Sequence, residues 1–348
     1  MATTTASVIS FSPKQAATRL LKVLPARARD VLVNRYGLGK ETKRQTLDSI
    51  GKRYHITRER VRQIENYAMA SVRKSEAYKK EKLSFTELEK AVHEFGGVVG
   101  EEAFLSYISK DASGRNHAQF LLALGEQFKK IKEDDHLKHR WHMDDKLAMK
   151  VHDALRKLYD SLTDKDLVSE LDIIAQFLTH VEDLDEHFKQ EQIVKRWLNL
   201  SKTIGKNPLG EWGLVSSPHI KMKGVRDYAF LVIRKHGSPI HFTEVARAIE
   251  KMFGKKAHVA TTHNELIKDK RFVLVGRGLY ALAEWGYMSG VVRDVIAKVL
   301  EKHGPLTKQQ IFDKVLKERY VKENTISVNL QNKKHFKKDK EGKYSAMK

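Results

Sequence analysis

The sequence predicts a mainly α-helical fold, in which a helix-turn-helix domain is followed by tandem winged-helix modules with short β-hairpin wings. Three observations predict it. Residues 46–74 have the caps and apolar spacing of two helices joined by a tight turn. Two C-terminal segments repeat one pattern of helices and a hairpin. The 348-residue chain also carries a formal net charge of +21.

The first helix of the predicted pair begins after Thr46, because a threonine hydroxyl is a good N-cap, and it carries Asp48 in its first turn. Three apolar residues follow at helical spacing: Leu47, Ile50 and Tyr54. We expect the chain to break at His55-Ile56 and Thr57 to cap the second helix.

The second helix is amphipathic in an informative way. Its inner face is apolar: Val61, Ile64, Ala68 and Val72. Its opposite face is polar: Arg58, Glu59, Arg62, Gln63 and Asn66. These are the side-chain types that read guanine, adenine and cytosine edges, and the N-terminal end of a recognition helix is the end that enters the major groove.

The stretch TLDSIGKRYHITRERVRQIE resembles the promoter-binding part of region 4 of primary bacterial sigma factors, and residues 24–39 resemble the first half of that region. In that family the residues matching Arg58, Glu59 and Gln63 read the −35 element, and those matching Arg53, Arg60 and Arg62 hold its phosphates. We therefore expect base reading by Arg58, Glu59 and Gln63, which match the family's readers, and by Arg62, which lies on the same polar face. The resemblance implies phosphate contact by Arg53, Thr57 and Arg60. The alternative is a helix-turn-helix that kept the scaffold but binds protein, or binds DNA without sequence preference.

The composition agrees with a polyanionic partner. The chain has 65 Lys+Arg against 44 Asp+Glu, and its isoelectric point is about 9.8. A membrane is the weaker choice, because the mean hydropathy is −0.51. There is no cysteine and no evident secretory signal, which fits a cytoplasmic chain. The resemblance to bacterial sigma factors implies a bacterial, nucleoid-associated protein.

Residues 232–249 and 299–315 are copies of one pattern. Each ends a helix in Lys-His-Gly, turns through a proline and starts a helix at a threonine, Thr243 or Thr307. Third helices are expected at 258–269 and 324–332, and aromatic-led hairpins at 272–282 and 336–347. Gly278 and Gly342 lie at the hairpin turns, where positive φ is tolerated. Three helices and a hairpin are the winged-helix plan.

Two weaker copies are expected upstream. Phe85–Met143 has a possible wing around 131–138, and Asp145–Ile220 is helix-rich and ends in a Trp212-containing hairpin. The predicted domains are a flexible N-terminus 1–15, the helix-turn-helix domain 16–80, a possible winged helix 83–144, a helix-rich module 145–222 that is a possible degenerate winged helix, and winged helices 223–288 and 289–348.

The segment Gly224–Tyr287 resembles the HARE helix-turn-helix domain, which is known from the delta subunit of RNA polymerase. The resemblance rests on RDYAFLVIRKHGSPIHFTEVARAI at its start and RFVLVGRGLYALAEWGY at its end. It implies a module associated with DNA or polymerase, without a particular ligand and without catalytic residues.

No set of residues predicts catalysis or a cofactor. His136, His139 and His142 with Asp144-Asp145 could form a zinc set, but the alternative is a hairpin or linker with solvated histidines. No phosphate-binding loop, nucleophile elbow or paired acidic strands accompany them. We expect no enzyme, no cofactor and no metal. Trp212 and Trp285 are expected to cover module cores rather than stack on bases.

The last wing is rich in lysine. Lys337, Lys338 and Lys340 would suit phosphate contact, although a solvated chain end would look the same.

Taken together, these resemblances lead us to expect a sequence-specific DNA-binding transcription regulator that recognises −35-type promoter DNA and acts with RNA polymerase. The short segment before the motif suggests that it is not a complete sigma factor. The alternative is a sequence-tolerant DNA-coating, nucleoid or restriction-associated protein. The oligomeric state is left open.

Overall fold

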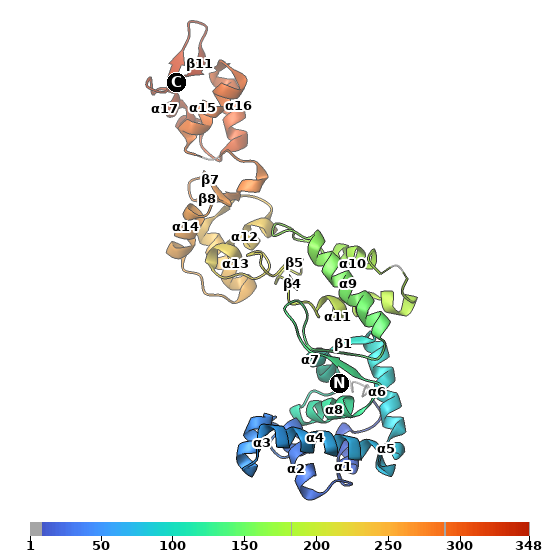
Figure 1. Cartoon of the computed structure of the whole chain (residues 1–348). Coiled ribbons are helices and arrows are strands. Elements are labelled where there is room, and N and C mark those ends of the chain that lie inside the picture. Colours follow the sequence, from blue (N-terminus) through green and yellow to red (C-terminus); the bar gives the residue numbers. More distant parts are fainter. Residues whose placement is uncertain (1–8, 182, 289, 348) are drawn as a thin grey trace, which may run out of the picture. The chain divides into compact units, whose positions relative to one another are not determined.

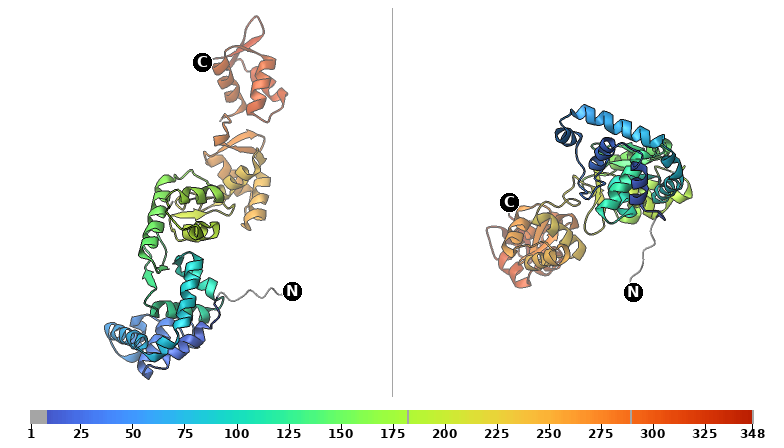
Figure 2. Two further views of the ribbon diagram at one scale, coloured as in Figure 1. Left: turned by 90° about the vertical axis from the view of Figure 1, so that its right-hand side faces the viewer. Right: turned by 90° about the horizontal axis from the view of Figure 1, so that it is seen from below.

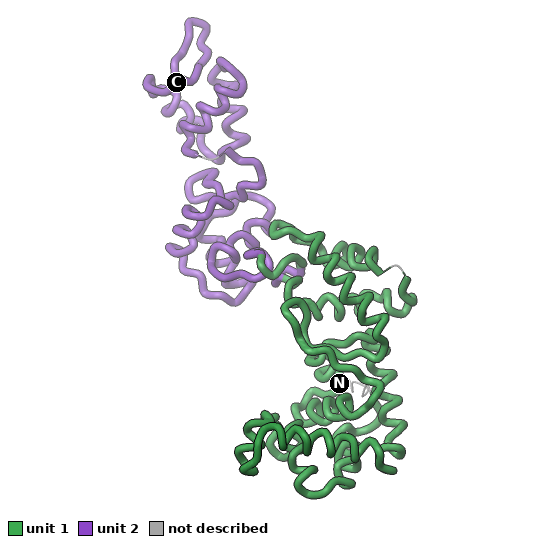
Figure 3. Tube along the Cα trace, in the orientation of Figure 1, with its two compact units in different colours: residues 1–206, 211–216 green, residues 207–210, 217–348 purple. Residues whose placement is uncertain are grey.

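The computed structural model describes residues 9–181, 183–288 and 290–347. The chain forms two compact units, residues 1–206 with 211–216 and residues 207–210 with 217–348 (Figure 3). It is mainly helical with small antiparallel sheets, as the sequence predicts. In the described part of the chain, no helix is long and apolar enough to cross a membrane.

Unit 1 opens with five helices, drawn in blue shades in Figures 1 and 2: α1 (Pro13–Leu21), α2 (Ala26–Tyr36), α3 (Leu47–Tyr54), α4 (Arg58–Arg73) and α5 (Glu76–Lys80). Leu20, Leu32 and Ala68 are fully buried between them. The expectation of a flexible N-terminus over 1–15 is wrong for its described part. Ile9 is buried in the core, and the Ser12 hydroxyl caps α1. Residues 1–8 lie outside the described range.

The next part of unit 1 contains three helices and a small sheet: α6 (Lys82–Phe95), β1 (Val98–Gly100), α7 (Glu101–Ile108), α8 (Ala112–Leu124), β2 (Lys129–Ile131) and β3 (Arg140–His142). The strand order is β1-β3-β2. The expected wing at 131–138 coincides with the end of β2 and the loop after it. Helix α8 packs on α1 and α2, and one hydrophobic core runs through both parts. The chain therefore continues its first core across the expected boundary at 80–83.

The last part of unit 1 comprises α9 (Asp145–Ser161), α10 (Glu170–Leu178), the 3-10 helix η1 (Glu186–Lys189), α11 (Glu191–Leu198), β4 (Ile204–Lys206) and β5 (Trp212–Leu214). Trp197 and Trp212 are among its largest fully buried side chains. The expectation that Trp212 covers a core is confirmed. The Trp197 indole N–H donates to Gly96 O at 3.1 Å, which ties this part to the preceding one.

Unit 2 contains two copies of the repeated pattern. The first comprises α12 (Val225–His236), β6 (Ile240–His241), α13 (Phe242–Phe253), α14 (Val259–Lys268), β7 (Phe272–Gly276), β8 (Leu279–Leu282) and η2 (Ala283–Trp285). The second comprises α15 (Val292–His303), β9 (Leu306–Thr307), α16 (Lys308–Glu318), α17 (Glu323–Leu330), β10 (Phe336–Lys338) and β11 (Lys343–Ala346). In each copy the hairpin pairs with a short third strand.

The local expectations for these copies hold with one correction. Gly278 and Gly342 have φ of 73° and 84°, as hairpin turns require. Thr307 caps α16, but α13 begins at Phe242 and its N-cap is His241, whose imidazole accepts a hydrogen bond from Thr243 N. His241 and Thr307 are equivalent positions, because each stands two residues after the proline and ends its short strand, whereas Thr243 lies two residues further along. Trp285 is partly buried against the β7–β8 core.

Candidate nucleic-acid interface

The turn between α3 and α4 is tight. His55 has a φ of 55°, and the Ile56 amide donates to Gly51 O at 3.0 Å. A side chain at Gly51 would place its Cβ 2.7 Å from Ile56 O, so the close approach requires glycine. The Thr46 and Thr57 hydroxyls accept from Ser49 N and Arg60 N, both at 3.1 Å. Both predicted N-caps are confirmed.

Apolar contacts on its inner face hold helix α4 in place. Val31, Ile50 and Val61 form a small cluster with no solvent exposure, which joins α2, α3 and the start of α4. Further along α4, Ala68 and Val72 enter the main core of unit 1. Helix α4 is therefore a rigid element whose inner face is packed against the rest of unit 1.

The outer face of α4 is solvent-exposed, and it carries all four residues expected to read bases: Arg58, Glu59, Arg62 and Gln63. Arg62 donates to both Glu59 carboxylate oxygens, at 2.9 and 2.7 Å, and Arg60 donates to Gln63 Oε1 at 3.0 Å. The hydrogen bond from Arg62 holds the pKa of Glu59 below its usual range. Within the described residues, Arg58 makes no hydrogen bond or ion pair.

The residues expected to hold phosphates gather around the same turn. Arg53 lies in the last turn of α3 and donates to Asn34 Oδ1 at 3.0 Å, whereas Thr57 and Arg60 lie at the start of α4. All three are exposed. The Thr57 oxygen accepts the capping bond, which leaves its hydroxyl proton available to a phosphate.

A cavity of about 420 Å³ lies beside this turn and is lined by Arg35, Thr46, Leu47, Asp48 and Arg58. Sequence reasoning missed Arg35. Its guanidinium donates to Gln45 O at 3.1 Å and lies 3.5 Å from the Glu65 carboxylate. No local pattern marks it, because Arg35 comes from α2 and meets the other residues only in the fold.

The lysines of the last hairpin lie in unit 2. Phe336 is buried and anchors β10, while Lys337, Lys338 and Lys340 are exposed. The Lys338 ammonium lies 5.6 Å from the centre of the Tyr344 ring. The three ammonium groups thus face solvent from a hairpin fixed at its base.

The histidine triplet does not come together as a metal site. His136 is exposed, His139 is half-buried, and His142 is buried in β3. The alternative of solvated histidines is therefore wrong for His142, because its strand is the centre of the β1-β3-β2 sheet. Among the residues that the structure describes, no group of three or more His, Asp or Glu side chains is placed to hold a metal ion.

Comparison with known families shows that residues 20–74 match the family of sigma-70, region 4. The matched segment runs from the end of α1 to the C-cap of α4, so it contains the whole α2–α3–α4 arrangement and its outer face. The chain thus carries a DNA-binding helix-turn-helix of a transcription-related type. A search of curated proteins gave no match.

Proposed function

We propose that this protein is a sequence-specific DNA-binding transcription regulator that reads −35-type promoter DNA with the N-terminal half of α4. One observation carries the proposal. The segment that matches sigma-70 region 4 ends in a helix whose inner face is buried and whose outer face exposes Arg58, Glu59, Arg62 and Gln63. We propose a binding role without catalysis.

The chemistry of this face suits base reading. Arginine pairs with guanine, glutamine with adenine, and glutamate accepts from the cytosine amino group, each worth about 1–3 kcal/mol of discrimination. In the free protein Glu59 pairs with Arg62, and Gln63 pairs with Arg60, at the surface. Exposed pairs of this kind contribute only about 0.2–1 kcal/mol, so DNA can replace them at small cost.

We further propose that the repeated three-helix and hairpin parts are winged-helix modules, with 224–287 of the HARE type. Lys337, Lys338 and Lys340 would then contact phosphates from the last wing. An action with RNA polymerase rests on two resemblances, that of 24–47 to sigma region 4 and that of 224–287 to the delta subunit. A bacterial, nucleoid-associated location follows from the same proposal.

The rival is a sequence-tolerant DNA-coating protein, which the formal net charge of +21 favours. Competition at about 150 mM salt between a duplex with a −35-type element and a shuffled duplex of equal length separates the two. The proposal predicts at least about tenfold tighter binding to the first, which equals 1.4 kcal/mol. Equal affinities would support the rival.

A further inference from the structure

We infer that the DNA flanking the site read by α4 lies along a second basic surface of unit 1, which extends from Arg58 to Lys202. The inference rests on the proposed function, because it takes duplex DNA at α4 as its starting point. It adds an interaction surface outside the matched helix-turn-helix, with the phosphate backbone as its ligand.

This surface, called the basic track below, follows three cavities that share lining residues. The cavity beside Arg58 shares Arg35 with a second cavity of about 430 Å³. The second shares Arg44, Glu101 and His139 with a third of about 710 Å³. A hollowed path thus continues from the turn before α4 to the start of α7 and the end of α11.

The path is strongly cationic. Its carboxylates are Asp48, Glu101, Glu102 and Glu133. Its cations are more than twice as many: Arg35, Arg44, Arg58, Arg115, Lys130, Lys132, Lys138, Arg196 and Lys202. They come from several helices, a strand and loops, so the excess is a product of the fold rather than of one basic run.

Most of these cations are positioned by neutral acceptors. Lys138 donates to Asn199 O at 2.9 Å, and Lys202 donates to Asp134 O at 2.9 Å. Arg196 likewise donates to Phe95 O at 3.0 Å, and Arg44 donates to the amide oxygen of Asn116 at 2.9 Å. Such bonds hold Lys138, Arg196 and Arg44 in place without cancelling their charge, which stays available to an anion. Lys202 also lies 3.9 Å from the exposed Glu133 carboxylate, and Lys130 and Arg35 pair with the carboxylates of Glu101 and Glu65.

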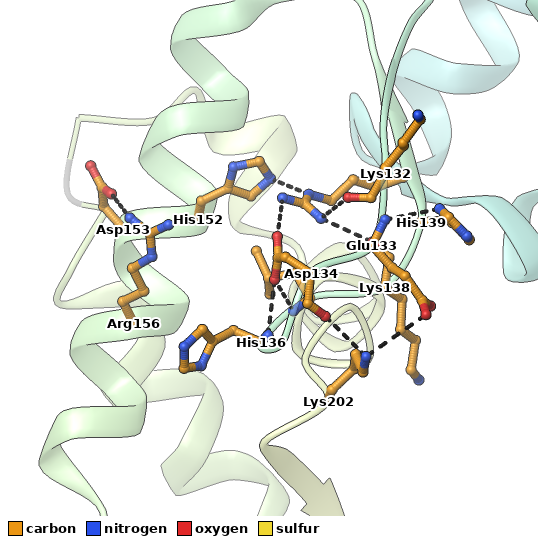
Figure 4. A network of polar contacts seen from close by, with 12 residues as sticks. Lys132, Glu133, Asp134, His136, Lys138, His139, His152, Asp153, Arg156 and Lys202 are labelled. Carbon is orange, nitrogen blue, oxygen red and sulfur yellow. Dashed lines mark hydrogen bonds and ion pairs between the residues drawn. The ribbon is translucent and has the colours of Figure 1, made fainter.

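The loop between β2 and β3 is pre-organised to present this charge (Figure 4). Buried Arg140 lies beneath it and donates to Lys132 O at 3.3 Å, to Lys138 O at 3.0 Å and to the Asp134 carboxylate at 3.1 Å. Its Nε donates to His152 Nε2 at 2.8 Å. Figure 4 shows the Lys132 side chain extending away from this network. In the part of the chain that the structure describes, its ammonium has no hydrogen bond or ion pair.

The loop and the reading helix belong to the same compact unit. Arg73, at the end of α4, donates to Leu124 O at 2.8 Å and to Ala123 O at 3.0 Å on α8. Helix α8 packs in turn on α1 and α2, and the core is continuous. Phosphates next to the bases read at Arg58 therefore meet the track without a domain rearrangement. Contacts to phosphates fix the position of a protein on a duplex.

The test measures how affinity depends on salt for two duplexes. The short duplex contains only the −35-type element that α4 is proposed to read, and the long duplex adds about two helical turns of DNA on each side. The full-length variant carries Lys132→Gln, Lys138→Gln and Lys202→Gln. Each lost phosphate contact makes the slope of log affinity against log salt shallower by about 0.9. We expect a slope shallower by up to about three on the long duplex and unchanged on the short one.

A matched control removes the same charge from exposed lysines off the track: Lys22→Gln, Lys80→Gln and Lys90→Gln. It should leave both slopes unchanged. The single variant Lys132→Gln controls for misfolding, because the Lys132 ammonium contacts no other group in the described structure. On the long duplex it should make the slope of log affinity against log salt shallower by up to about 0.9.

Equal slopes for variant and wild type on the long duplex would overturn the inference and leave the track to another anion, such as an acidic protein. An equal change on both duplexes, or the same change in the control, would also overturn it. These outcomes are distinct from failure of the proposed function, which would appear as wild-type protein without sequence preference.

Discussion

Gly51→Ala tests the geometry of the turn that aims α4. The new Cβ would lie 2.7 Å from Ile56 O, and that oxygen is main chain, so a side-chain rotation cannot relieve the contact. Ile56 is also tied to Gly51 by its own amide hydrogen bond. Forcing an extra carbon into a tight site costs about 1–3 kcal/mol. Alanine gains about 0.8–1.0 kcal/mol over glycine in helix propensity. The expected net effect is a loss of about 1 kcal/mol.

Amide hydrogen exchange of α3 and α4 measures this loss of stability locally, within unit 1. Thermal or denaturant unfolding of the whole two-unit chain does not resolve it. Ser49→Ala is the control, because exposed Ser49 lies in the same helix and its hydroxyl makes no hydrogen bond in the described structure. It should be neutral or slightly stabilising. Gly51→Ala should exchange faster and prefer its DNA site less strongly. If Gly51→Ala protects these amides as well as Ser49→Ala, the turn is not packed as described.

Three further outcomes are expected. Burial and the neighbouring Arg140 charge lower the pKa of His152 to about 4. Between about pH 6.5 and pH 4, His152 is therefore protonated in the unfolded chain but neutral in the folded chain. Unit 1 should lose stability as the pH falls through this range. His152→Gln keeps an acceptor for Arg140 and should flatten that part of the melting-temperature profile; an unchanged profile would exclude His152 as its source. Replacing Lys337, Lys338 and Lys340 by glutamine should make the salt slope shallower by up to about three, and no change would mean that these lysines are only solvated. In bacterial extract the protein should co-purify with core RNA polymerase after nuclease treatment, and loss of polymerase at that step would favour the DNA-coating rival.

The sequence predicted best what local chemistry determines. Thr46, Thr57 and Thr307 cap helices because a hydroxyl just before the first turn accepts hydrogen bonds from the free amides of that turn. The inner face of α4 was readable for the same reason, since Val61 and Val72 follow helical spacing and are fully buried. The four side chains expected to read bases lie on the exposed face, although their role stays a prediction.

Long-range packing could not be read in this way. Nothing near Ile9 signals that it is buried in the core, or that the adjacent Ser10 meets Glu87. Arg140, set between histidines and lysines, suggests a solvated hairpin, yet it is buried because its acceptors come from its own loop and from α9. The basic track depends on the same kind of contact, because Arg35, Arg44 and Lys132 adjoin one cavity only after α8 has packed on α1 and α2.

The central claim is that the N-terminal end of α4 reads base pairs, and a selection of bound sequences from random duplex DNA tests it most directly. Wild-type protein should enrich a −35-type motif. Arg58→Ala and Gln63→Ala should each lose preference at one or two base pairs, with non-specific affinity nearly intact. Lys74→Ala removes a charge from the exposed far end of the same helix and should keep the wild-type motif. Retention of the full wild-type motif by both Arg58→Ala and Gln63→Ala would contradict the claim.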